Sequence, residues 1–341
     1  LYDPHSPIRI KMLHYYSGKK IDQNFFKTKI EEAYEIRKPL LNEKTNSYRL
    51  IYGENDGFPG FIADVYDTVM VVKLYSSIWF PYLHTIIEEL IQVSNCKVIV
   101  LRLSRNLQNQ ETFGLKDGQV LYGNLDNEIV EFFEFGIKFS AHVIHGHKTG
   151  YFLDHRHNRK KVGELSKGKS VLDVFSYAGG FSVHALVGGA TQVYSVDISK
   201  QALEMAKYNA SLNEFSGEYL TLVGDAFEIL RELIEQGKTF DLVVIDPPSF
   251  AKSNKEESLA KRKYEELAEL GVQLVANNGT LVLASCSSRV SSEDFFIINE
   301  MVLENSQRNY KVLNKTYHDI DHPVNFKEGA YLKCGYYQFK D

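Results

Sequence analysis

The stretch Val171-Leu-Asp-Val-Phe-Ser-Tyr-Ala-Gly-Gly-Phe-Ser182 decides the fold class of this 341-residue chain. It reads as an apolar strand that runs into a turn of small residues, and the turn opens a helix. A second strand, Val193-Tyr-Ser-Val-Asp197, follows and ends on a carboxylate. In doubly wound α/β folds such a turn lets the backbone approach a nucleotide-like cofactor, and the acid binds ribose hydroxyls. The stretch therefore predicts an α/β domain that binds a cofactor of this kind.

Three further motifs each follow a predicted strand of the same domain: Gly224-Asp225-Ala226, Asp246-Pro-Pro-Ser-Phe250 and Ala284-Ser-Cys-Ser-Ser288. Apolar runs place strands near residues 171–175, 192–196, 219–223, 240–245, 279–285, 310–317 and 330–339. Helical segments separate the first five strands, as parallel crossover units require. We therefore predict an α/β fold, with a Rossmann-like domain whose seven-stranded sheet is mostly parallel and whose last strand runs antiparallel.

The region before this domain has a different pattern. Residues 8–13 read as a strand, and residues 24–41 as an amphipathic helix that Pro39 closes. Short strands with turn residues between them are expected at 49–52, 61–65, 69–74, 98–103, 119–123 and 129–135, with a helix at 82–92. We expect a terminal segment at 1–45, a small α+β domain at 46–141 and the Rossmann-like domain at 142–341.

Bulk properties limit the class of protein. No run of about 18 apolar residues and no signal peptide is apparent, so we expect no membrane association. The three cysteines are widely spaced and odd in number, which indicates neither a disulfide framework nor a zinc site and is typical of a reducing cytoplasm. The net charge of −5 argues mildly against a nucleic-acid substrate. The first residue is Leu1 rather than Met, which predicts that the front of the chain is missing.

The turn residues indicate which cofactor fits. Glycines would be expected at positions 175, 177 and 179, but Phe175 and Tyr177 occupy the first two, and only Gly179 matches. This disfavours a dinucleotide, whose pyrophosphate needs bare backbone at the helix start. S-adenosylmethionine (SAM) has no phosphate and remains compatible. Asp197 is expected to bind the ribose, or else to cap a helix. Asp225 could bind the adenine amino group, cap the following helix, or do both.

Two other motifs predict chemistry at the same end of the sheet. The rigid turn at Asp246 and Pro247 offers acceptors for the edge of a flipped-out base that carries an amino group. Cys286 is expected to enter the same crevice, where it would be a nucleophile rather than one more small packing residue. We interpret Cys96 and Cys334 as packing residues.

The histidine-rich segment 142–161 suggests a metal site, because His145 and His147, and likewise His155 and His157, are two residues apart in the sequence. No cysteine or carboxylate cluster completes a ligand shell, so we expect no metal. A basic strip that faces a phosphate backbone is the better interpretation.

The chain resembles the bacterial 23S rRNA cytosine-C5 methyltransferases of the PUA-domain type, over nearly all of its length. The most specific motifs are His147-Lys-Thr-Gly-Tyr-Phe-Leu-Asp-His-Arg156, Gly53-Glu-Asn-Asp-Gly-Phe-Pro-Gly60, Asp321-His-Pro-Val324, and the turn, Asp-Pro-Pro-Ser-Phe and Ser-Cys-Ser motifs given above. The resemblance implies an RNA-binding PUA domain, of which residues 1–45 would be the remnant with a linker helix, a middle α+β domain, and a class I SAM-dependent methyltransferase domain. It implies 23S rRNA as partner and leaves the oligomeric state open, with a homodimer among the options.

By similarity, one segment would line the methionine side of SAM with Thr149, Tyr151, Phe152, Leu153, Asp154 and Arg156. The other expected cofactor residues are Asp173, Phe175, Ser176, Tyr177, Gly179, Gly180, Asp197, Ile198, Asp225, Ala226, Asp246 and Pro247. One departure is Ser249, which stands where related RNA cytosine-C5 enzymes often carry a second cysteine.

The predicted reaction is C5 methylation of a cytosine in ribosomal RNA. Cys286 would attack C6 as a thiolate, and Asp246 would hold the N3 and N4 edge of the base. The nearest alternative is an rRNA guanine-N methyltransferase with a similar SAM pocket, which needs no thiol. A non-catalytic SAM-binding ribosome-assembly factor is a second alternative.

Overall fold

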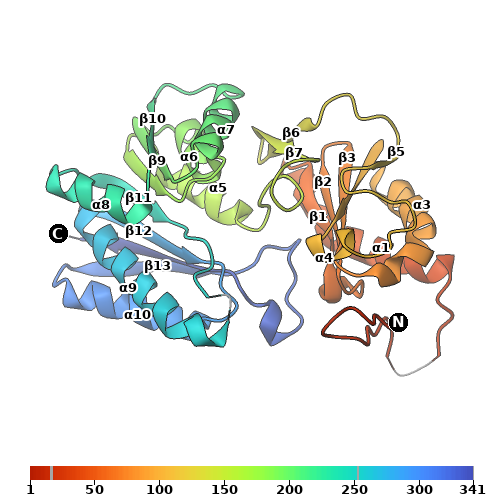
Figure 1. Ribbon diagram of the computed structural model, residues 1–341. Coiled ribbons are helices and arrows are strands. Elements are labelled where there is room, and N and C mark those ends of the chain that lie inside the picture. The colour runs from red at the N-terminus through yellow and green to blue at the C-terminus, as the bar shows by residue number, and fades with distance from the viewer. Residues whose placement is uncertain (16–17, 252, 341) are drawn as a thin grey trace. The chain divides into compact units, whose positions relative to one another are not determined.

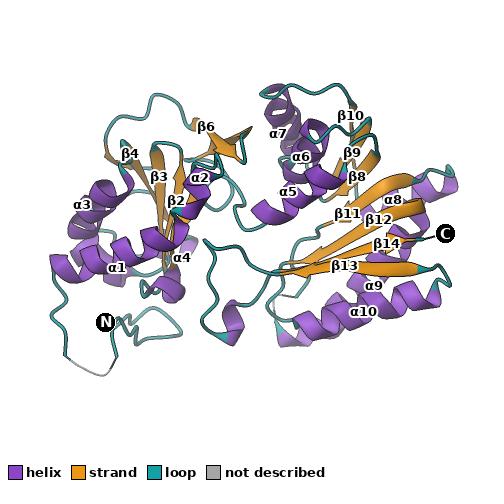
Figure 2. Ribbon diagram, turned by 180° about the vertical axis from the view of Figure 1, so that it is seen from behind, coloured by secondary structure: helices purple, strands orange, loops and turns teal. Residues whose placement is uncertain are grey.

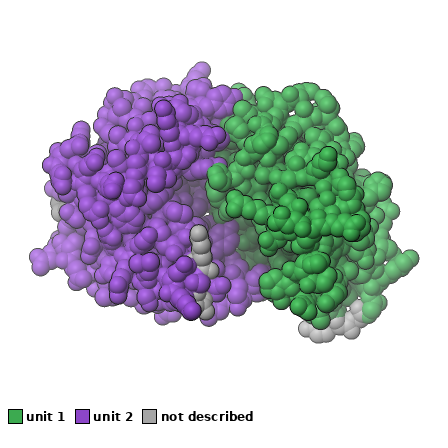
Figure 3. All heavy atoms as spheres, viewed as in Figure 1, with its two compact units in different colours: residues 1–154, 319–325 green, residues 155–318, 326–341 purple. Residues whose placement is uncertain are grey.

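The computed structural model describes residues 1–15, 18–251 and 253–340. The chain forms two compact units, unit 1 with residues 1–154 and 319–325, and unit 2 with residues 155–318 and 326–341 (Figure 3). Each unit has its own apolar core. The boundary expected between residues 141 and 142 lies inside unit 1. The return of residues 319–325 to unit 1 was not predicted.

Unit 2 contains a seven-stranded sheet in the order β10-β9-β8-β11-β12-β14-β13 (Figure 1). Its strands are β8 (Ser170–Val174), β9 (Gln192–Asp197), β10 (Glu218–Val223), β11 (Phe240–Ile245), β12 (Val275–Ser285), β13 (Tyr310–Thr316) and β14 (Lys333–Phe339). The five neighbouring strands β10, β9, β8, β11 and β12 pair in parallel, and β14 is antiparallel to both of its neighbours, β12 and β13. This confirms the predicted sheet. The strand order reverses between β8 and β11, where doubly wound folds bind their ligands.

Helices cover both faces of this sheet (Figures 1 and 2). One face carries α5 (Arg156–Leu165), α6 (Gly180–Val187) and α7 (Lys200–Ser211), and the other carries α8 (Ala226–Glu235), α9 (Glu257–Leu274) and α10 (Ser292–Asn305). The short 3₁₀ turns are η3 (Asn254–Glu256) and η4 (Lys327–Gly329). Side-chain oxygens of Ser199, Asp225 and Ser291 cap the first turns of α7, α8 and α10. The caps fix where each helix begins after its strand.

Unit 1 is built on a five-stranded sheet in the order β1-β2-β3-β4-β5 and a two-stranded sheet, β6-β7. The strands are β1 (Ser47–Tyr52), β2 (Phe61–Tyr66), β3 (Val69–Leu74), β4 (Val98–Leu103), β5 (Val120–Tyr122), β6 (Ile129–Glu134) and β7 (Ile137–His142). The helical segments are α1 (Gln23–Arg37), α2 (Pro39–Asn42), η1 (Gly53–Asp56), η2 (Ser77–Tyr82), α3 (Leu83–Ser94) and α4 (Arg105–Gln108). Most predicted elements are therefore present, whereas β7 was not predicted.

The strand predicted at residues 8–13 is wrong. The structure has only an isolated bridge between Tyr2 and Ile10 there. Ile8 and Ile10 are both 70% exposed, so the apolar alternation that suggested a strand does not face a core. A strand needs a neighbour along its whole length, and one bridge does not supply it.

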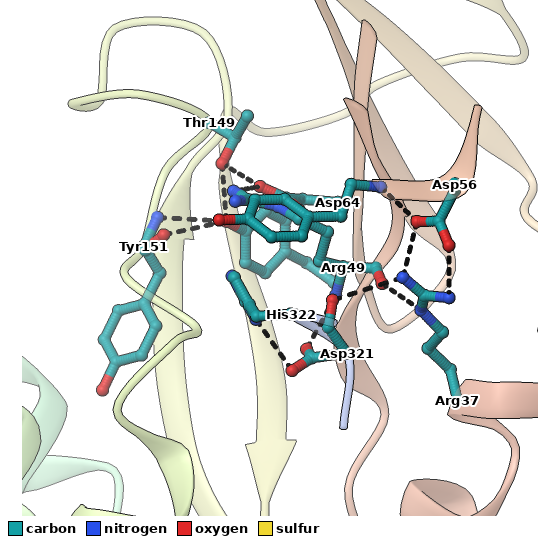
Figure 4. A network of polar contacts seen from close by, with 10 residues as sticks. Arg37, Arg49, Asp56, Asp64, Thr149, Tyr151, Asp321 and His322 are labelled. Atoms are coloured by element: carbon teal, nitrogen blue, oxygen red, sulfur yellow. Dashed lines mark hydrogen bonds and ion pairs between the residues drawn. The ribbon is translucent and has the colours of Figure 1, made fainter. Parts of the chain in front are cut away.

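A buried polar network holds residues 319–325 in unit 1 (Figure 4). Asp321 accepts a hydrogen bond from the backbone N–H of Arg49 (2.9 Å), and its other oxygen contacts Nδ1 of His322 (2.9 Å). Arg37 forms a bidentate pair with Asp56 (2.9 and 2.6 Å) and donates to the carbonyl of Asp321 (3.4 Å). Because Arg37 and Asp321 are fully buried, these bonds replace water as partners.

No helix in the described part of the chain has the length and apolar character that crossing a bilayer requires.

Candidate active site

The turn after β8 has the backbone of a glycine-rich turn although it contains little glycine. Phe175, Tyr177 and Gly179 all have positive φ, at 64°, 47° and 77°. The N–H of Tyr177 donates to a carboxylate oxygen of Asp197 (2.9 Å), which ties the turn to the end of β9. A side chain at position 179 would place its Cβ 2.8 Å from that of Ala206, so glycine is required there. Phe175 and Tyr177 therefore replace the expected glycines without changing the backbone conformation of the turn.

Two acids, Asp197 as the last residue of β9 and Asp225 after β10, differ in the hydrogen bonds that they make locally. Asp197 accepts from the N–H groups of Tyr177 and Ser199, and Ser199 itself caps α7, so Asp197 is not the helix cap. Asp225 does cap α8, since it accepts from the N–H groups at residues 227 and 228 (2.9 and 3.3 Å). The predicted ribose contact of Asp197 and adenine contact of Asp225 stay predictions.

Asp173 near the end of β8 provides a test of whether the site fits SAM. It is fully buried, and one oxygen accepts from the N–H (3.0 Å) and hydroxyl (2.6 Å) of Ser182. The other oxygen has no hydrogen-bond partner among the described residues. Burial raises the pKa of Asp173 to about 7, with Ser182 opposing the rise and the charges of Asp246 and Asp197 adding to it. A buried acceptor at the switch point fits the ammonium group of SAM.

Strands β11 and β12 place Asp246 and Cys286 at the same edge of the sheet. Their carboxyl ends are adjacent because the two strands pair in parallel. The thiol of Cys286 donates to the carbonyl of Pro247 at 3.7 Å, so the loops that carry the two predicted catalytic residues are in contact. Cys286 is partly exposed, whereas Cys96 and Cys334 are buried and burial raises the pKa of both thiols.

Two residues of this site were missed. Lys333 at the start of β14 is buried, and its ammonium group donates to the carbonyls of Ser287 and Val290 in the loop after Cys286. Burial lowers the pKa of Lys333 to about 8, and Cys286 nearby opposes the shift. Nε2 of His155 lies 3.3 Å from Asp246, although His155 was read only as part of a histidine pair and a basic strip. Neither contact has a sequence signature, because the partners are far apart in the chain.

The segment expected to line the methionine side of SAM divides between the units. Thr149, Tyr151, Phe152, Leu153 and Asp154 belong to unit 1, and Arg156 belongs to unit 2 as the first residue of α5. The hydroxyl of Thr149 donates to Asp64 (2.5 Å), and Tyr66 binds both that hydroxyl and the backbone of Tyr151 (Figure 4). These groups are thus hydrogen-bonded within unit 1, and their contacts with SAM stay predictions.

The remaining predicted cofactor residues follow strands of unit 2: Ser176, Ile198 and Pro247 lie in loops, and Gly180 and Ala226 are the first residues of α6 and α8. Ile198 is 74% exposed directly after Asp197, which leaves an apolar surface beside the predicted ribose acid. Across the described ranges, no three His, Cys, Asp or Glu side chains are grouped so that they could hold a metal ion.

Comparisons with known proteins identify the family to which the chain belongs. The family model of S-adenosylmethionine-dependent methyltransferases matches residues 48–328. The ribosomal RNA large subunit methyltransferase of Deinococcus radiodurans is 41% identical over 99% of this chain and 85% of its own length. Ribosomal RNA large subunit methyltransferase I of Aliivibrio fischeri is 35% identical over 97% of this chain and 85% of its own length.

Solved structures share the fold at lower identity. SMU.776 in complex with SAH has a TM-score of 0.80 and 24% identity, over 94% of this chain and 83% of that one. The tRNA m1G37 methyltransferase of M. jannaschii has a TM-score of 0.57 and 15% identity, over 96% and 81%. The cofactor is SAM, and the chain belongs to the S-adenosylmethionine-dependent methyltransferase family, in the branch of the ribosomal RNA large subunit methyltransferases.

Proposed function

We propose that this protein methylates C5 of a cytosine in large-subunit ribosomal RNA through a covalent bond between Cys286 and C6 of the base. The observation that carries the proposal is the contact between the thiol of Cys286 and the carbonyl of Pro247 at 3.7 Å. It supports the proposal because the thiol lies beside the loop that carries Asp246. A methyltransferase that acts on a guanine nitrogen has no use for a thiol at this place.

The residues at the two loops supply what cytosine C5 methylation needs. Bound SAM provides an electrophilic methyl group. The thiolate of Cys286 forms a bond to C6, and the electrons of the C5–C6 double bond make C5 nucleophilic while the carboxylate of Asp246 accepts a hydrogen bond from the N4 amino group. After C5 has been methylated, a base removes the C5 proton and the electrons expel the Cys286 thiolate. The buried ammonium group of Lys333 stabilises that thiolate electrostatically.

The RNA substrate in this proposal rests on the relatives, which are named for large-subunit ribosomal RNA. The first helix of unit 2, α5, has the basic run Arg159-Lys-Lys161, but Arg159 is buried and the ammonium group of Lys161 lies over the ring of Tyr336, so this run does not support the predicted basic strip. We retain residues 1–45 as the proposed end of an RNA-binding PUA domain, with a linker helix.

The test is methyl transfer from labelled SAM to unmodified, deproteinised 23S rRNA, with the product nucleoside identified by mass spectrometry. We expect 5-methylcytidine from the wild-type protein. Cys286→Ala should abolish it while the Kd for SAM is retained, and Cys96→Ala, which removes a thiol in unit 1, should keep it. A methylguanosine product that survives Cys286→Ala would replace this proposal with the guanine-N alternative.

A further inference from the structure

We propose that His155 is a positioning residue that orients the carboxylate of Asp246 toward the substrate base, and that Asn158 selects the ring tautomer which makes this possible. The inference rests on the proposed function, because it assigns Asp246 to the base. His155 and Asn158 lie at the start of α5, whereas Asp246 directly follows β11, much later in the sequence.

The orientation of the Asn158 side chain is fixed by two hydroxyl groups. Thr316 at the end of β13 donates to Oδ1 of Asn158 (2.6 Å), and Tyr336 in β14 donates to the same oxygen (2.9 Å). The amide nitrogen of Asn158 therefore faces the other way, toward Nδ1 of His155 at 3.1 Å. Asn158 and Tyr336 are buried, so water does not compete for these bonds.

This arrangement determines which ring nitrogen of His155 carries the proton. The amide nitrogen of Asn158 can only donate, so Nδ1 of His155 must accept and is unprotonated. The proton is then on Nε2, which lies 3.3 Å from Oδ1 of Asp246. The Thr316 and Tyr336 hydroxyls, Asn158 and His155 thus form one directed chain of hydrogen-bond donors, and its link to Asp246 is a 3.3 Å contact rather than an aligned hydrogen bond.

The chain of donors has a consequence for the substrate. When substrate binding aligns Nε2–H of His155 with Oδ1, the second oxygen of Asp246 is the one left for the amino edge of the base. The side chain of His155 is 6% exposed and that of Asp246 is 22% exposed, so the donor is inside and the carboxylate reaches the surface of the site. Contacts of 3.3 Å between catalytic groups tighten when the substrate binds.

Two substitutions separate this role from simple packing. In His155→Asn, Oδ1 replaces Nδ1 as the acceptor for Asn158, but the side chain is too short to reach Asp246. In His155→Gln, the amide nitrogen takes the place of Nε2 and keeps the donor to Asp246. We expect kcat to fall about 100-fold in His155→Asn and to stay within about 5-fold of wild type in His155→Gln. The Kd for SAM should be unchanged in both variants.

A spectroscopic measurement tests the tautomer without RNA. In protein labelled with ¹⁵N-histidine, long-range ¹H–¹⁵N spectra should show His155 protonated at Nε2 and unprotonated at Nδ1, and Asp246→Asn should shift the Nε2–H resonance. Equal kcat values for His155→Asn and His155→Gln, or a proton on Nδ1, would overturn the proposal. The product nucleoside of the wild-type protein is identified in the same assay. A product other than 5-methylcytidine would refute the proposed function. The tautomer measurement would still show whether His155 carries its proton on Nε2.

Discussion

Binding of SAM should depend on pH through Asp173. One oxygen of this buried carboxylate accepts from Ser182 and the other has no partner among the described residues. If the ammonium group of SAM fills that position, binding requires the ionised form. Because burial raises the pKa of Asp173 to about 7, the ligand-free protein is mostly protonated at this residue below neutral pH. Affinity for SAM should therefore fall as the pH falls.

The size of the effect follows from the pKa. With a value near 7, the ionised fraction at pH 6 is about one-tenth of that at pH 8, so the Kd for SAM should be about 10-fold weaker at pH 6. Ionising this residue in the ligand-free fold costs on the order of 4 kcal/mol. The folded state holds a proton that the unfolded state has lost, so the contribution of Asp173 to stability decreases as pH rises from about 4 to 7. Asp173→Asn should stabilise the ligand-free protein at pH 8 and bind SAM more weakly.

The assay is calorimetric titration of SAM at pH 6, 7 and 8 into the wild-type protein and Asp173→Asn. The ammonium group of SAM titrates equally in both experiments, so the ratio of the two Kd values isolates Asp173. Thermal unfolding without ligand supplies the stability comparison. A wild-type Kd that changes with pH in parallel with that of Asp173→Asn would refute the assignment, as would a variant that is less stable than wild type at pH 8.

Two further predictions concern buried charges. Lys333→Met should slow methyl transfer about 100-fold with the Kd for SAM retained, because the loop after Cys286 loses its ammonium donor. Iodoacetamide should also alkylate Cys286 more slowly at pH 7 in this variant. An unchanged alkylation rate would show that Lys333 does not influence the thiol. Arg37→Ala should lower the free energy of unfolding of unit 1 by about 3–5 kcal/mol, because it leaves Asp56 buried without its bidentate partner. A loss below about 1 kcal/mol in urea denaturation would contradict this prediction.

The sheet of unit 2 could be predicted from sequence because its strands are short apolar runs that end on turn residues. Once five such runs alternate with helices, the strands are expected to run parallel, which brings their carboxyl ends to one edge of the sheet. The prediction that Asp246 and Cys286 lie at the same edge follows from this and from the position of each motif directly after its strand. It uses only local patterns and one general constraint on connections.

The contacts that were missed join residues far apart in the chain. Asp321 receives its hydrogen bond from Arg49, 272 residues earlier, and Thr316 reaches Asn158 across 158 residues. Nothing near Asp321 in the sequence shows that its segment returns to unit 1. The same holds for Lys333, a lone cation at the start of an apolar strand, whose carbonyl partners lie in the loop after β12.

The turn after β8 shows why glycine content was an indirect guide to the cofactor. Positive φ at Phe175 and Tyr177 costs about 1–2 kcal/mol per residue, and it persists because the surrounding bonds over-determine the backbone. Those bonds use the turn's own donors: the N–H of Ser176 binds the carbonyl of Val196, and the N–H of Tyr177 binds Asp197. A dinucleotide site directs such N–H groups at a pyrophosphate. Here they are directed at the neighbouring strand β9 instead, so the turn is suited to a cofactor without phosphate, and SAM is such a cofactor.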